Sequence, residues 1–134
     1  MATRTPLRDF VAENLTLRVS TSHEGKAEDG ISLIWSGKAN LRYPMQVLGP
    51  YFDTLVNAAE ESGNLLEFHF ETLEHLNSST ILALMRLIQT LRQKRIRLRI
   101  FFDAAHKWQK MTFEALRQFD RNDGLFEFRG SPSR

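Results

Sequence analysis

The sequence predicts a single α/β domain in which helices cover one face of a mainly parallel sheet. Two kinds of segment follow one another along the chain. In one kind, apolar and polar residues alternate, as in strands buried on one side; in the other, apolar residues recur every three or four positions, as in amphipathic helices. The resulting order is β-β-α-β-α-β-α-β, and strands joined through helices pair in parallel by right-handed crossovers. Consecutive strand order then places every helix on the same face of the sheet.

Five strands are predicted from the alternation of apolar and polar residues. They span residues 15–19, 31–35, 66–70, 96–102 and 126–128. The first two are separated by a polar loop and are expected to form a hairpin. Strands covered on both faces would be apolar throughout, so the polar side chains are expected on an open face, with Glu67 close to an arginine. These side chains are Glu67, His69, Arg97 and Arg99. Part of the open face is expected to be covered by three residues of the N-terminal segment: Leu7, Phe10 and Val11.

Three helices are predicted from apolar residues at helical spacing, over residues 45–62, 80–93 and 107–119. Gly63 is a plausible stop for the first helix. The inward residues are expected to be Leu48, Phe52, Leu55 and Ala59 in the first, Ile81, Leu84, Met85, Ile88 and Leu91 in the second, and Trp108, Met111, Ala115, Leu116 and Phe119 in the third. Trp108, Met111 and Phe119 could also line a ligand pocket, but their helical spacing favours a place in the core.

The size and charge of the chain are ordinary for one globular domain. Its 134 residues can bury a core without covalent staples. A net charge of +2, from 18 basic and 16 acidic side chains, demands no anionic partner. The absence of cysteine excludes disulfides and thiol catalysis and suits a reducing compartment. With no signal peptide or membrane-spanning run in view, we expect a cytoplasmic domain over 1–134, with a core of about 15–128, an N-terminal segment 1–14 and a flexible tail 129–134.

The residue patterns argue against an enzyme. Glu74, His75 and Ser78 suggest a hydrolase, but the chain has no Gly-x-Ser-x-Gly turn and no further acid placed to orient the histidine. The four histidines lack metal-ligand spacing, and the glycines are too scattered for a phosphate loop. We therefore predict no catalytic residue, no metal and no cofactor.

A basic run over residues 92–99 invites a nucleic-acid interpretation. Arg97 and Arg99 have the spacing of one strand face, however, and Arg92 to Arg95 closes a helix whose dipole favours cations. Aromatic residues are not interleaved with these charges, as binding of single strands would favour. A solvated charged face is the favoured interpretation, with no specific nucleic-acid binding.

The segment from Phe68 to Phe102 is the most informative part of the chain. A strand leads into Asn77-Ser78-Ser79-Thr80 at the start of an amphipathic helix, and a basic turn then leads into the next strand. This arrangement resembles the STAS (anti-sigma-factor antagonist) family, in which a strand leads into Asp-Ser-Ser-Gly or Asp-Ser-Thr-Gly at a helix start. The resemblance covers roughly residues 15–128, and it is to a bacterial subgroup with Asn-Ser-Ser at this point.

The resemblance implies a regulatory site. In antagonists of the family, the first serine of the pair is phosphorylated by a serine kinase that is often also the binding partner, and a phosphatase reverses the modification. By position this serine is Ser78, and Asn77, Ser78, Ser79 and Thr80 are the implied partner-binding residues. Asn77 replaces the family's Asp, and Thr80 replaces its Gly. Asn and Ser are also ordinary helix N-caps, so a purely structural role for these residues stays open.

The resemblance implies a protein-binding module of a bacterial partner-switching pathway, with a serine kinase or anti-sigma-like protein and a phosphatase as partners. The alternative is a small-ligand sensor or carrier domain, since STAS-like folds also bind nucleotides or apolar ligands. Neither interpretation calls for insertion into a membrane.

Overall fold

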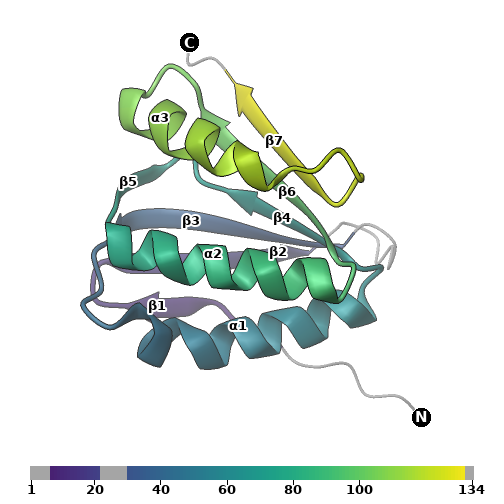
Figure 1. Cartoon of the computed structure of the whole chain (residues 1–134). Helices are drawn as coiled ribbons and strands as arrows, with labels where there is room; N and C mark the ends of the chain where they lie inside the picture. The colour runs from purple at the N-terminus through teal and green to yellow at the C-terminus, as the bar shows by residue number, and fades with distance from the viewer. Residues whose placement is uncertain (1–6, 22–29, 132–134) are drawn as a thin grey trace.

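The computed structural model of the chain describes residues 7–21 and 30–131, and these form a sheet with three helices on one of its faces (Figure 1). The strands are β1 (Phe10–Ala12), β2 (Leu15–Thr21), β3 (Ile31–Ala39), β4 (Leu65–His69), β5 (Leu73–Leu76), β6 (Arg97–Asp103) and β7 (Phe126–Ser131). The helices are α1 (Pro44–Glu61), α2 (Ser78–Gln93) and α3 (Lys107–Leu116), and a 3₁₀ turn, η3 (Arg117–Phe119), follows α3.

The sheet has the order β1-β2-β3-β4-β6-β7, and β5 lies beside β3 beyond the end of β4. The β1–β2 and β2–β3 pairs are antiparallel, and the pairs β3–β4, β3–β5, β4–β6 and β6–β7 are parallel. The predicted mainly parallel sheet with helices on one face is therefore confirmed. Two short strands, β1 and β5, are additions to the predicted order.

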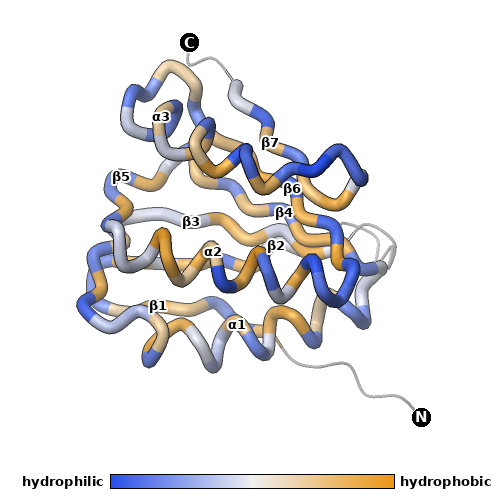
Figure 2. Tube along the Cα trace, viewed as in Figure 1, coloured by the Kyte–Doolittle hydropathy of each residue, from blue (hydrophilic) through white to orange (hydrophobic). Residues whose placement is uncertain are grey.

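The core lies between the sheet and the helix layer. Trp35 of β3 is fully buried at its centre, and its ring centroid lies 5.6 Å from that of Phe68 and 4.9 Å from that of Phe70. Hydrophobic residues recur along each helix and through the central strands (Figure 2). Seven residues of α1 are buried, and the predicted inward residues of this helix are among them: Leu48, Phe52, Leu55 and Ala59.

The open face of the sheet carries paired charges. Arg99 of β6 donates to Glu67 of β4 at 3.1 Å and lies 3.4 Å from a carboxylate oxygen of Glu127 on β7. Beside this row, the His69 ring stacks on Phe101 with centroids 4.6 Å apart. The expected position of Glu67 next to an arginine is confirmed, and Arg99 is matched by two carboxylates of the same face.

The N-terminal segment extends the sheet and does not cover its open face as expected. Phe10 pairs with Leu17 of β2, and its ring lies 5.0 Å from that of Tyr51 on α1, which places Phe10 on the helix side. Tyr51 donates its hydroxyl to the carbonyl of Arg8, and burial, together with the Asp9 carboxylate, raises the pKa of Tyr51 to about 12. Val11, on the other side of β1, is 70% exposed.

The inward face of α3 also differs from the prediction. Its buried residues are Gln109, Phe113 and Leu116, whereas Met111 is 66% exposed and Ala115 is exposed. Trp108 and Phe119 are only partly buried. On this face the Gln109 amide donates to the carbonyls of Phe70 and Leu73 and accepts from the Asp103 N–H at the end of β6. Gln109 could not be predicted as an inward residue, because the prediction depends on the spacing of apolar residues.

The face of α2 is predicted correctly at its buried positions. Leu84 and Ile88 are each 2% exposed, and Leu91 is fully buried. We expect Leu84→Ala to lower the free energy of unfolding by about 2–5 kcal/mol, because it removes transfer free energy and leaves a cavity. Leu82→Ala on the same helix is the matched control, since Leu82 is 59% exposed. Equal urea midpoints for the two variants would contradict the packing of α2.

Candidate functional site

The start of α2 is built around the side chain of Asn77, which caps the helix. Its Oδ1 accepts from the Thr80 backbone N–H at 3.0 Å and from the Thr80 hydroxyl. Its Nδ2 donates to the carbonyl of Leu41 at 3.1 Å, and its backbone N–H donates to the carbonyl of Ala39 at 2.9 Å. A carboxylate at this position could cap the helix but could not donate to Leu41. Asn77 therefore fixes the start of α2 to the segment that leads into α1.

The four residues expected to bind a partner divide into two pairs. Ser78 and Ser79, in the first turn of α2, are exposed. Asn77 is half-buried and Thr80 is fully buried, so Thr80 has no surface to offer a partner. Asn77 and Thr80 form a support, on which the two serines are presented to solvent.

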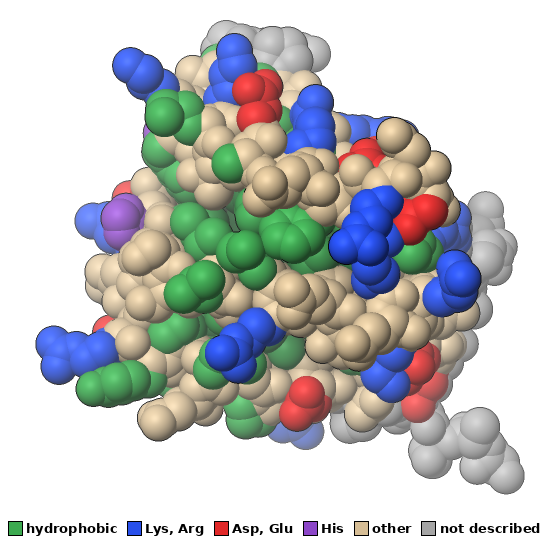
Figure 3. Space-filling view, viewed as in Figure 1, with side chains coloured by type: hydrophobic (Ala, Val, Ile, Leu, Met, Phe, Trp, Pro, Cys, Tyr) green, Lys and Arg blue, Asp and Glu red, His purple; other side chains and the backbone are tan. Residues whose placement is uncertain are grey.

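A hollow of about 390 Å³ lies beside this support, between the first turns of α1 and α2. It is lined by Arg42, Tyr43, Pro44, Met45, Gln46, Ser79, Leu82, Ala83 and Arg86. Three large apolar side chains here are exposed: Tyr43 by 62%, Met45 by 41% and Leu82 by 59%. Hydrophobic side chains with Lys and Arg beside them gather over these helix starts, toward the lower left of Figure 3.

Sequence reasoning did not find this hollow, although Leu82 carried a signal. Leu82 is an apolar residue on the polar side of α2, outside the stripe that faces the sheet. Tyr43 and Met45 flank Pro44, the first residue of α1, and nothing in the sequence joins them to α2. In the structure, the Asn77–Leu41 hydrogen bond links the start of α2 to the segment before α1, and the two helices pack side by side.

The hollow is cationic. Arg42 and Arg86 both line it, and in the part of the chain that the structure describes neither of them lies within ion-pair distance of a carboxylate. The sixteen residues of α2 include no Asp or Glu. Unmatched positive charge beside exposed apolar side chains is typical of a surface that meets another molecule.

The same region offers no arrangement for nucleophilic catalysis. Glu74 and His75 are exposed on β5, and among the described residues no hydrogen bond joins either of them to Ser78. Within residues 7–21 and 30–131 there is no group of three His, Asp or Glu side chains that could hold a metal ion. No described helix is long and apolar enough to cross a membrane.

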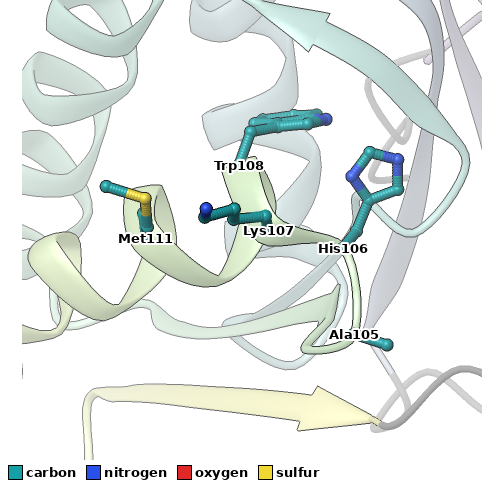
Figure 4. Close-up of a pocket in the computed structure, with 5 residues that line it drawn as sticks. All are labelled: Ala105, His106, Lys107, Trp108 and Met111. Carbon is teal, nitrogen blue, oxygen red and sulfur yellow. The ribbon is translucent and has the colours of Figure 1, made fainter.

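A second hollow, of about 580 Å³, lies at the start of α3 (Figure 4). It is lined by Ala105, His106, Lys107, Trp108 and Met111, all from one stretch of chain. The Trp108 ring packs edge-on against His106, with centroids 5.9 Å apart. Because its walls come from one stretch, this hollow is a surface depression, unlike the enclosed clefts that hold most small ligands.

Comparisons with known proteins establish the fold. No protein-family model matches the sequence, and no curated protein matches it. The structure is similar to the activator chain in the crystal structure of diguanylate cyclase SiaD in complex with its activator SiaC from Pseudomonas aeruginosa. The TM-score is 0.57 at 17% sequence identity, over 92% of this chain and 98% of that chain. The STAS-like fold predicted from the sequence is thereby confirmed.

Proposed function

We propose that this chain is a regulatory protein-binding module of the anti-sigma-factor antagonist type, which docks a partner through the start of α2 and is switched by phosphorylation at Ser78. The observation that carries the proposal is the exposed serine pair on the support formed by half-buried Asn77 and buried Thr80, next to a cationic and apolar hollow. The contact residues are Ser78 and Ser79 with the accessible part of Asn77. Thr80 contributes indirectly, through its hydrogen bonds to the Asn77 side chain.

Phosphorylation at Ser78 suits the physics of this position. Ser78 is the first residue of α2, where free backbone N–H groups and the helix dipole favour negative charge. A phosphate there adds about −1.5 to −2 charges at neutral pH without disturbing the core. The same charge would lie within the interface with a docked partner, so phosphorylation at Ser78 is proposed to weaken binding of the partner.

The partner is proposed to be a signalling protein. The sequence resemblance suggests a serine kinase or anti-sigma-like protein, with a phosphatase that removes the phosphate. The likeness to SiaC adds a diguanylate cyclase as a partner class, with this chain as its activator. In each case the chain acts in the cytoplasm by binding and not by catalysis.

A small-ligand sensor or carrier is the second candidate function, and the depression around Trp108 is the observation that favours it. Ligand sites usually bury most of the surface of the ligand, which a depression formed by one stretch of chain does poorly. Native mass spectrometry of protein purified from its own host separates the two functions, because a retained small molecule supports the sensor.

A pull-down from native lysate, with the phosphorylation of the bait mapped in the same experiment, tests the proposed function. We expect a signalling protein to co-purify with unmodified chain, and phosphate, where present on the bait, to lie on Ser78. Bait phosphorylated at Ser78 is expected to be depleted from the complex. A complex equally rich in Ser78-phosphorylated chain would contradict the switch.

A further inference from the structure

We infer that the groove between α1 and α2 receives an acidic amphipathic helix of the partner protein, with its carboxylates on Arg42 and Arg86 and its apolar side chains against Tyr43, Met45 and Leu82. This inference rests on the proposed function as a protein-binding module and identifies the chemistry of the partner. The α1–α2 groove is defined as the hollow of about 390 Å³ beside Ser79 together with its continuation along the two helices.

The groove is elongated because α1 and α2 lie side by side (Figure 1). A second hollow of about 150 Å³ continues from the first and shares Met45 and Arg86 with it. Gly49 lines the second hollow, and a Cβ built there would have only the Met45 Cε within 4 Å, at 3.7 Å, so the groove is open at this point. From Tyr43 to Asp53 the groove follows about 15 Å of helix, at 1.5 Å per residue, which matches roughly three turns of a partner helix.

The apolar part of the groove explains why the occupant is amphipathic. Tyr43, Met45 and Leu82 expose between 41% and 62% of their surface around one hollow, where isolated exposure would need no explanation. A helix docked in a groove places apolar anchors at i, i+3, i+4 and i+7 against such a surface. Flexible methionine and leucine side chains adapt to anchors of several shapes.

The charge of the groove determines the sign of the occupant. Arg42 and Arg86 have no carboxylate partner among the described residues, whereas Arg92 at the end of α2 and Arg99 of β6 are paired with acids. Carboxylates of a partner helix would complement both free guanidinium groups. A basic partner helix would meet like charge at the wider hollow, whose lining holds Arg42 and Arg86 and no acid. Asp53 lines only the narrower continuation of the groove.

An acidic occupant also accounts for the position of the serine pair. Ser79 lines the hollow with Arg42 and Arg86, and Ser78 precedes it at the start of α2. A phosphate at this end would repel the carboxylates of the partner and compete with them for the arginines. The Asn77–Leu41 hydrogen bond joins the segment that carries Arg42 to the same end of the groove as the serines.

The test uses the full chain, labelled with ¹⁵N, and two synthetic helical peptides. Both peptides carry a leucine stripe at i, i+4 and i+7; glutamates flank the stripe in one and lysines replace every glutamate in the other. We expect the acidic peptide to shift backbone amides of residues 42–53 and 79–90, and the basic peptide to leave them unchanged. Arg42→Gln combined with Arg86→Gln should weaken acidic-peptide binding about tenfold or more. Arg121→Gln, at an exposed arginine outside the groove, is the control, and this variant should bind the acidic peptide as tightly as the wild-type chain does.

The inference is overturned if both peptides bind alike, if the shifts fall outside the groove, if no shift appears at millimolar peptide, or if the double variant binds normally. The peptide experiment contains no native partner and no phosphate. A failure of the proposed switch would therefore appear only in the pull-down, and a failure of the acidic-helix inference only in the titration.

Discussion

Gln109→Leu is expected to lower the free energy of unfolding by about 2–6 kcal/mol, although it exchanges a polar residue for an apolar one in a buried place. Gln109 is fully buried. Its Nε2 donates to the carbonyls of Phe70 at 2.8 Å and Leu73 at 3.0 Å, and its Oε1 accepts from the Asp103 N–H at 2.8 Å. Leucine leaves the Leu73 carbonyl and the Asp103 N–H without this partner, and each buried unsatisfied group costs about 1–3 kcal/mol. The Phe70 carbonyl still accepts from the Leu73 N–H at 2.9 Å.

The measurement is urea unfolding, with Gln118→Leu as the matched control because Gln118 is exposed after the end of α3. A lower midpoint with an unchanged slope would show a loss of native stability and not a change in the unfolded state. A Gln109 variant as stable as the Gln118 variant would contradict the bridging role of this amide.

The sheet and two of the helix faces were predictable because local patterns determine them. Ile31, Leu33 and Trp35 recur at every second position of β3 and are buried, and Leu84 and Ile88 follow helical spacing and are buried. The Glu67–Arg99 pair was predictable for the same reason, since alternation puts both on one face of neighbouring strands. These features depend on periodicity alone.

The rest depends on contacts between distant segments. Leu73–Leu76 forms the strand β5 by pairing with the end of β3. Gln109 of α3 then hydrogen-bonds both to Phe70, between β4 and β5, and to Asp103 at the end of β6. A residue that is buried for its hydrogen bonds gives no apolar signal, so Gln109 was missed and Met111 and Ala115 were wrongly placed on the inward face of α3. Leu116 is buried as predicted, and Trp108 and Phe119 pack against the core.

Only part of the candidate site could be predicted from the sequence. Ser78 and Ser79 were located by their motif, and the structure places both in the exposed first turn of α2. The arginines of the hollow could not be found in this way. Arg42 and Arg86 lie on different elements and line one hollow only in the folded chain, where α1 packs beside α2 and Asn77 holds the carbonyl of Leu41.

Ser78→Asp is expected to weaken binding of the native partner at least about 30-fold while leaving the domain folded. A negative charge buried in a close contact without a matching cation costs about 2–5 kcal/mol, and each 1.4 kcal/mol is a factor of ten in affinity. The stability of the fold is expected to be unaffected by the substitution, because Ser78 is exposed and the dipole of α2 favours an acid in the first turn by about 0.3–1 kcal/mol. The readouts are a thermal melt and a pull-down of the partner from native lysate.

Two variants separate a switch from a helix cap. Ser78→Ala should keep the partner, because the proposal requires only the absence of negative charge at this position. Asn77→Ala removes the actual cap, so it should lower the melting temperature, whereas Ser78→Asp should not. Ser79→Asp places the charge on the residue that lines the hollow, and we expect it to weaken binding less than Ser78→Asp if the first serine is the switch. An unfolded Ser78→Asp variant would make Ser78 a structural residue, and undiminished binding by this variant would place the contact surface elsewhere.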